Sequence, residues 1–343
     1  MKIKQFIEKC VAENVFPGAA WIIGNSEKVF EKGNVGVLGQ GLGPVTDDSL
    51  YDIASVTKLF TASAFMKQFE EGLARLEDPV EYFLPSFHGS SAGEILIYNL
   101  LTHTSILKTI GKLYEKGRNR AGMLEEIKAI TPRSDSPEKV LYTCEAFILL
   151  GEIISAIDSA PLDKIVRQRV FEPLRMKDTC YNPPASVIDR IAATENCLWR
   201  GKIVRGQVHD ENAAVLDGVS GNAGIFSNII DMSRFAVAML GSFESGIFLK
   251  KPIMELITRN HTEGKGENRG LAWMKPTPSM SAGDLLSKNS FGHTGFTGTS
   301  LWIDPDRKFY IVLLSNRVHP TRDNPKIFRA RQILHNLAVL EYA

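Results

Sequence analysis

The sequence is short of the features that would place it in several common classes of protein. Its four cysteines, Cys10, Cys144, Cys180 and Cys197, stand far apart and form no CxxC pair. A zinc site or a disulfide framework therefore has no support from the sequence, and buried or free thiols are expected. No apolar stretch approaches the roughly eighteen residues of a membrane span, so no membrane partner is expected.

The chain also lacks an excess of charge of either sign. Its 40 Lys and Arg and 39 Asp and Glu residues give a formal net charge of +1. Such a balance provides no electrostatic attraction to nucleic acid, and a small molecule or a short peptide is the expected partner. The first twenty residues carry charges among their apolar residues and lack the apolar core of a signal peptide, which favours a cytoplasmic protein.

What is present is a similar hydrophobic pattern at both ends of the chain. Residues 2–14 have helical spacing, and residues 19–37 read as two strands around a polar turn. Residues 300–316 repeat the two-strand pattern, and a second helical pattern follows them. We therefore expect an α+β fold in which both ends share one antiparallel sheet flanked by terminal helices.

The middle of the chain is mostly helical in pattern. Strands and helices that are segregated along a sequence indicate separate layers. We expect a sheet domain made of residues 1–62 and 215–343, with a mainly helical domain of residues 63–214 inserted into it.

The clearest chemical pattern is a serine followed three residues later by a lysine. It occurs at Ser55 with Lys58, at Ser105 with Lys108 and at Ser136 with Lys139. Only the first pair precedes an apolar helical stripe, which would bury the helix and fix its first turn. The Lys58 amine can then contact the Ser55 hydroxyl, and the helix N-terminus would stabilise an alkoxide and favour a neutral lysine. On this stretch alone, an N-cap serine with a solvated lysine is the more ordinary interpretation.

Two further stretches complete a set with this serine. "VLYTCEAFILLGEII" puts Tyr142 before an amphipathic helix, and "FGHTGFTGTSLWIDP" puts His293, Thr294 and Gly295 at a glycine-rich strand edge. With "SVTK", in this order, they resemble the serine β-lactamase and penicillin-binding protein superfamily, in its class-C-like branch of DD-peptidases, β-lactamases and esterases. "FPGAA", "LLTHTS", "GNAGIFSN" and "LLSNRVHP" extend the resemblance along the chain.

This resemblance implies a β-lactamase/transpeptidase-like fold and a serine hydrolase that works through an acyl-enzyme without metal or organic cofactor. It implies that Ser55 is the acylated nucleophile and that Lys58 is its proton acceptor or relay. Tyr142 would share the proton and pass it to the leaving group. The strand that begins at His293 matches the Lys-Thr-Gly motif of the superfamily, and the backbone N–H groups of Phe296 and Ser55 would form the oxyanion hole.

Two positions depart from the superfamily pattern. The tyrosine motif commonly reads Tyr-x-Asn, whereas here Cys144 stands where that amide would hold the substrate. The third motif begins with His293 in place of lysine, and a histidine is only partly charged near pH 7, so capture of a substrate carboxylate would be weaker and pH-dependent.

Both departures favour hydrolysis of small esters, amides or D-amino-acid peptides. One alternative is a DD-carboxypeptidase or β-lactamase proper, in which a β-lactam forms a covalent adduct. Another is a non-catalytic scaffold or penicillin-binding receptor with the same fold.

A run of three polar residues, His209, Asp210 and Glu211, also invites a functional reading. Adjacent residues do not converge on a metal ion as an i, i+4 pair on a helix does. We therefore expect a loop that borders the cleft, and no metal site.

Overall fold

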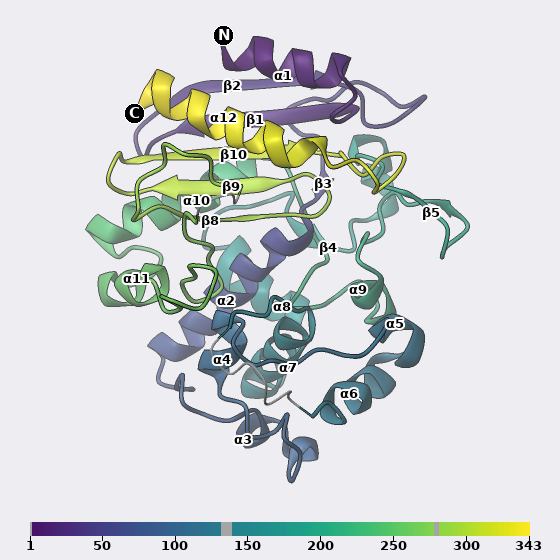
Figure 1. Ribbon diagram of the computed structural model, residues 1–343, viewed down its shortest axis with the longest axis vertical. Helices are drawn as coiled ribbons and strands as arrows, with labels where there is room; N and C mark the ends of the chain where they lie inside the picture. Colours follow the sequence, from purple (N-terminus) through teal and green to yellow (C-terminus); the bar gives the residue numbers. More distant parts are fainter. Residues whose placement is uncertain (1, 132–138, 278–280) are drawn as a thin grey trace.

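The main sheet is made from both ends of the chain. The computed structural model describes residues 2–131, 139–277 and 281–343. Its largest sheet has five antiparallel strands in the order β2-β1-β10-β9-β8 (Figure 1). These strands are β1 (Gly18–Gly24), β2 (Val29–Gly36), β8 (Phe291–Thr294), β9 (Ser300–Asp304) and β10 (Phe309–Ser315). The prediction of one antiparallel sheet shared by both ends is confirmed.

The central strands of this sheet are buried on both faces. All residues of β1 and of β10 are buried, and the two strands pair from Ala19 with Ser315 to Gly24 with Tyr310. Strand β2 lies at the edge and is only partly buried. The continuous apolar runs of β1 and β10 are typical of strands that are covered on both sides.

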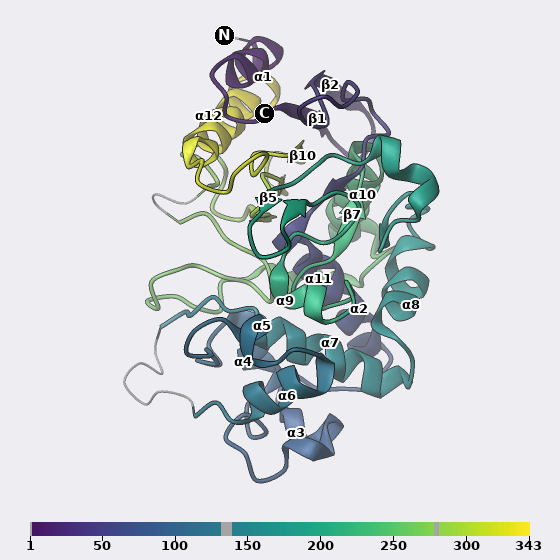
Figure 2. The same cartoon turned by 90° about the vertical axis from the view of Figure 1, so that its right-hand side faces the viewer.

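Helices cover the two faces of the sheet. On one face, α1 (Ile3–Ala12) and α12 (Lys326–Tyr342) lie side by side and pack against Trp21 and Ile23 (Figures 1 and 2). On the other face, α10 (Ile229–Ser245) packs against β1 and β10, where Ala20 and Ile22 join the larger hydrophobic core. The alternation of residues 20–23 between two cores follows from the period of a strand.

The middle of the chain forms a cluster of helices beside the sheet (Figure 1). The central one is α7 (Glu145–Asp158), which packs against α2 (Thr57–Glu70), α4 (Ile97–Thr102) and α8 (Leu162–Val166). The others are α3 (Val80–Phe83), α5 (Leu113–Lys116), α6 (Arg120–Lys128), α9 (Glu211–Val215) and α11 (Lys251–Thr258). The division into two domains stays a prediction, and α2 runs across residue 62, where we placed the boundary.

Two small β elements connect the helices to the sheet. β3 (Tyr51–Asp52) and β4 (Cys180–Tyr181) both pair with β7 (Ile225–Ser227), while β5 (Asn196–Cys197) and β6 (Lys202–Ile203) form a hairpin. Because β3 ends just before Ser55, its pairing with β7 fixes the start of α2 next to the loop that precedes β7. Across the described ranges, no helix combines the length and the apolar character needed to cross a lipid bilayer.

Candidate active site

Ser55 lies in a tight turn. The buried carboxylate of Asp52 holds this turn in place by accepting backbone hydrogen bonds. The turn is the short 3₁₀ segment Ala54–Val56, directly before α2. Ala54 has φ of +46°, which is unusual for an alanine, and its N–H donates to Asp52 Oδ1 at 2.8 Å. The other oxygen of Asp52 accepts from the N–H of His209 at 2.6 Å. Backbone strain that is held in this way is typical of functional sites.

Lys58 is completely buried and points at Ser55. Its Nζ lies 3.3 Å from Ser55 Oγ and donates to the Asn222 carbonyl at 2.9 Å. Burial alone would lower the pKa of Lys58, but Tyr142 and the neighbouring acidic groups raise it above its ordinary value. The raised pKa of Lys58 therefore runs against our expectation of a neutral amine.

Tyr142 completes the group, lying against Lys58 just before α7. The Lys58 Nζ is 4.9 Å from the centre of its ring, and a hydrogen bond that Tyr142 accepts from Lys58 is one of the effects that raise the pKa of Lys58. The ring also lies 4.5 Å from that of His103 and remains 37% exposed. Ser55, Lys58 and Tyr142, which were selected from separate stretches of sequence, thus lie together.

The segment after β8 is tied to the turn that carries Ser55. Thr297 Oγ1 donates to the Asp52 carbonyl at 2.7 Å, and Thr299 Oγ1 donates to the Ile53 carbonyl at 3.0 Å. Gly295 is required at this close approach, since a Cβ there would lie 2.4 Å from the Ile53 carbonyl oxygen.

Two backbone N–H groups at this site have no hydrogen-bond acceptor among the described residues. Among the described residues, the N–H groups of Ser55 and Phe296 make no hydrogen bond. They belong to the two segments that the threonines tie together, so they suit an oxyanion hole, which needs preorganised donors.

His293 is buried, and its protonation differs from our expectation. Its Nδ1 lies 2.8 Å from the carbonyl oxygen of Thr294, which can only accept, so Nδ1 carries the proton. Its Nε2 is buried and has no partner in the described part of the chain. Burial, followed by the charges of Arg269 and Lys58, holds the pKa of His293 well below its usual value. The expected partial charge near pH 7 is therefore wrong, and the ring is neutral.

Cys144 lies at the start of α7, next to Lys58. Burial raises the pKa of its thiol to about 12, so the sulfur remains protonated. The Asn222 side chain lies within hydrogen-bonding reach of this thiol, and its Nδ2 is 3.2 Å from Asp210 Oδ1. Sequence analysis missed Asn222, because only the folding of its loop against α2 brings it to the site.

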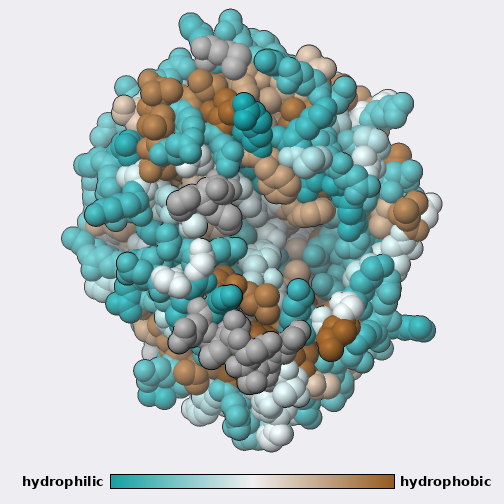
Figure 3. Space-filling view, viewed as in Figure 1, coloured by the Kyte–Doolittle hydropathy of each residue, from teal (hydrophilic) through white to brown (hydrophobic). Residues whose placement is uncertain are grey.

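A cavity of about 180 Å³ opens at Ser55. The face seen in Figure 1 is hollowed between the sheet and the helical cluster (Figure 3). The cavity is lined by Ala54, Ser55, His209, Asp210, Glu211, Ala223, Phe296 and Arg322. The polar run that begins at His209 therefore borders the cavity, as we expected.

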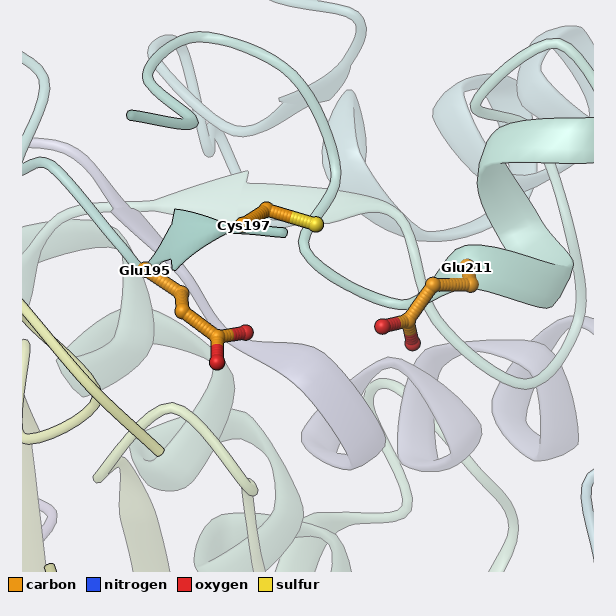
Figure 4. A group of neighbouring side chains, drawn as sticks. All are labelled: Glu195, Cys197 and Glu211. Carbon is orange, nitrogen blue, oxygen red and sulfur yellow. The ribbon is translucent and has the colours of Figure 1, made fainter. Parts of the chain in front are cut away.

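An acidic group borders this cavity. Glu195, Cys197 and Glu211 place one ligand atom each within 4.8 Å of one another, and the two carboxylates point toward each other (Figure 4). The Arg322 guanidinium binds both, with Nε 2.7 Å from Glu195 Oε2 and Nη2 2.5 Å from Glu211 Oε1. Because this guanidinium already neutralises part of their charge and His209 Nε2 lies 2.9 Å from Glu195 Oε2, the group fits an ion-pair network better than a metal site.

The pair at Ser105 and Lys108 offers no comparable geometry. The Ser105 hydroxyl is buried and has no hydrogen-bond partner among the described residues, and Ser136 lies outside the described residues. Of the two pairs whose serine the structure describes, only the pair at Ser55 combines a lysine contact with a cavity.

Comparisons with known proteins show what the chain is similar to. Residues 3–335 match the family model described as Beta-lactamase. A putative D-alanyl-D-alanine carboxypeptidase of Salmonella heidelberg (strain SL476) is 32% identical over 327 residues, covering 82% of this chain and 72% of that protein. An N-acetylmuramyl-L-alanine amidase of Bacillus subtilis (strain 168) is 27% identical over 383 residues, covering 96% and 85%. Among solved structures, EstCE1, a hydrolase with promiscuous acyltransferase activity, has a TM-score of 0.79 at 16% identity, covering 98% of this chain and 97% of that chain.

Proposed function

The chain belongs to the beta-lactamase family, a family of serine hydrolases with the fold expected from its motifs, and from this premise we propose that it hydrolyses small esters, amides or D-amino-acid peptides through an acyl-enzyme on Ser55. The observation that carries this proposal is the contact of 3.3 Å between Lys58 Nζ and Ser55 Oγ, because Ser55 lines a cavity and the Tyr142 ring lies 4.9 Å from the same amine. A serine hydroxyl becomes a nucleophile only when a neighbouring group takes its proton.

The proposed reaction has two steps. Ser55 Oγ bonds to the substrate carbonyl carbon, and its proton passes through the Lys58 and Tyr142 pair to the leaving oxygen or nitrogen as that bond breaks. Water then attacks the acyl-enzyme, giving its proton back along the same pair, and the acid is released with Ser55 restored. The N–H groups of Ser55 and Phe296 are suited to hold the carbonyl oxygen in both steps.

A fluorophosphonate probe tests the nucleophile directly. We expect a single adduct on Ser55 in the intact protein, located by mass mapping of peptides, because the Ser105 hydroxyl is buried. An adduct on Ser105 or Ser136 in place of Ser55 would contradict the assignment. A protein that takes up neither this probe nor a fluorescent penicillin would instead be the non-catalytic scaffold that we considered above.

We expect residue 144 to determine the preference of the protein for ester over amide substrates. An asparagine there would offer two donors and an acceptor to a substrate amide, whereas the protonated Cys144 thiol is only a weak donor. We expect the Cys144→Asn variant to raise kcat/KM for nitrocefin relative to a p-nitrophenyl ester by roughly ten- to a hundredfold, which corresponds to about 1 to 3 kcal/mol for one regained hydrogen bond.

The matched control for this variant is Cys180→Asn, because Cys180 is also half-buried and lies in β4, outside the cavity at Ser55. The control should leave the ratio of the two kcat/KM values unchanged. A ratio that stays the same in Cys144→Asn as well would show that residue 144 does not contact the substrate amide.

The second candidate function is that of a DD-carboxypeptidase. Its support is the Salmonella relative described as a putative D-alanyl-D-alanine carboxypeptidase. The neutral His293 counts against it, because an uncharged imidazole attracts a terminal carboxylate less than a lysine does. Turnover of a D-alanyl-D-alanine peptide faster than of its C-terminal amide would favour this function over ester hydrolysis.

A further inference from the structure

The turn that carries Phe296 is held by a buried arginine of α12. Arg331 Nη2 donates to the carbonyl oxygen of Gly295 at 2.6 Å and to that of Thr299 at 2.8 Å. The same two residues also close the turn through the backbone, because the Gly295 N–H donates to the Thr299 carbonyl at 2.7 Å. One nitrogen from the C-terminal helix therefore binds both ends of the segment between β8 and β9.

Arg331 binds the same peptide group that supplies the Phe296 N–H. The carbonyl of Gly295 and the N–H of Phe296 belong to one peptide bond, and in a trans peptide, as this one is, they point in opposite directions. A carbonyl that is held by Arg331 therefore fixes the direction of the N–H, which points away from that guanidinium. A charged donor on the carbonyl also polarises the peptide group and makes its N–H a stronger donor.

The backbone of Phe296 is held from its other side as well. Arg317 Nε donates to the Phe296 carbonyl at 2.8 Å, and Arg317 Nη1 donates to the Arg322 carbonyl at 2.8 Å. Two arginines thus bind the carbonyl before and the carbonyl after the Phe296 Cα. The backbone there cannot rotate without breaking a hydrogen bond to a charged donor.

Stability alone does not explain a buried arginine at this position. Arg331 is 2% exposed, its Nε has no partner in the described part of the chain, and no carboxylate there forms an ion pair with it. Burial, followed by the charge of Arg317, lowers the pKa of Arg331 to about 9, so the guanidinium is still charged at pH 7. A buried charge without a counter-charge costs free energy, and an apolar replacement is often neutral or stabilising.

The two carbonyls that Arg331 binds do not depend on it to be satisfied. The Gly295 carbonyl also accepts from the Gly298 N–H at 3.1 Å, and the Thr299 carbonyl also accepts from the Gly295 N–H. Removal of the guanidinium would therefore leave each carbonyl with a backbone donor. What the turn would lose is the fixed and polarised peptide group in front of Phe296.

We infer that Arg331 is a positioning residue for the oxyanion hole, whose guanidinium fixes and polarises the peptide group between Gly295 and Phe296. This inference rests on the proposed function, in which the Phe296 N–H holds the carbonyl oxygen of the substrate. Negative charge builds on that oxygen when Ser55 attacks, so a firmly placed donor stabilises the transition state more than the bound substrate. Arg331 should therefore act on kcat and leave KM nearly unchanged.

The test combines kcat and KM for p-nitrophenyl acetate with the inhibition constant of phenylboronic acid, all measured on the full-length protein. The boron atom bonds to Ser55 Oγ and becomes tetrahedral, with an oxygen in the place of the substrate oxyanion, so its affinity reports on the oxyanion hole. In Arg331→Met we expect kcat to fall and the inhibition constant to rise by a similar factor, roughly ten- to a hundredfold. KM should stay within a factor of about two, and the melting temperature should not fall. Arg331→Lys keeps the charge and should lie between the wild type and Arg331→Met.

The matched control is Arg234→Met, because Arg234 also lies on a long helix, α10, and donates to a backbone carbonyl, that of Arg175, outside the cavity at Ser55. Its kcat, KM and inhibition constant should equal those of the wild type. A lower kcat in Arg331→Met without weaker boronic acid inhibition would make Arg331 a structural residue and overturn the inference, as would no change in either. If Arg331→Met does not fold, the same two measurements on Arg331→Lys decide.

Fluorophosphonate labelling of the wild-type protein separates the failure of this inference from the failure of the proposed function. A labelled Ser55 together with unchanged constants in Arg331→Met would leave the proposed function intact and overturn the inference alone. A wild-type protein that takes up no label at Ser55 would overturn both.

Discussion

Replacing Lys58 by alanine is expected to lower the rate of Ser55 acylation by roughly three to six powers of ten, as in other hydrolases whose nucleophile and base act as one unit. The physical reason is that the amine both contacts Ser55 Oγ and places a positive charge 4.9 Å from the ring of Tyr142. Without it, the Ser55 hydroxyl has no hydrogen-bonded side chain among the described residues to take its proton. The measurement is the single-turnover rate with a p-nitrophenyl ester, with circular dichroism to confirm the fold.

The matched control for this variant is Lys67→Ala on the same helix. Lys67 is partly buried and paired with Glu70, but it lies at the far end of α2 and does not contact Ser55. Its removal should leave the acylation rate within a factor of about two while costing some stability, as surface ion pairs do. Rates near those of the wild type in Lys58→Ala would remove Lys58 from the mechanism.

Tyr142→Phe should reduce turnover by roughly 10²- to 10⁴-fold, which is the range for losing a general acid–base group. The phenylalanine keeps the ring that packs 4.5 Å from His103, so no cavity opens. Because the side chain is 37% exposed, the melting temperature should change little. The loss should be larger for an alkyl ester than for a p-nitrophenyl ester, since the alkoxide needs a proton in order to leave.

The corresponding control is Tyr342→Phe. Tyr342 lies near the C-terminus, far from Ser55 in the chain and in the fold, and its phenol hydroxyl donates to Glu31. Activity should be unaffected there. Parallel losses of activity and of thermal stability in Tyr142→Phe would indicate that Tyr142 is mainly structural.

Local patterns predicted the elements of this protein well where a single segment carries the signal. The apolar runs of β1 and β10 predicted buried strands, and the spacing of Ser55 and Lys58 on a helix start predicted their contact. The register of Ala19 opposite Ser315 could not be read from either strand alone, because it depends on two segments from opposite ends of the chain.

The electrostatics of the candidate site could not be predicted from the sequence for a related reason. Whether Lys58 keeps its proton depends on Tyr142 and Asp210, and its carbonyl partner at Asn222 is 164 residues away. Burial of His293, which decides its charge, likewise follows from packing and not from its motif.

The threonine bonds from the segment after β8 to the segment before Ser55 have a consequence for protein synthesis. Thr297 and Asp52 are 245 residues apart, and Thr299 and Ile53 are 246 apart. Ser55 therefore leaves the ribosome long before the two threonines, which lie far further along the chain. A nascent or C-terminally shortened chain can form the helix that carries Ser55, but it cannot assemble the donors around it. Hydrolytic activity should thus appear only once the segment between β8 and β9 has been made and has folded back against the residues before Ser55.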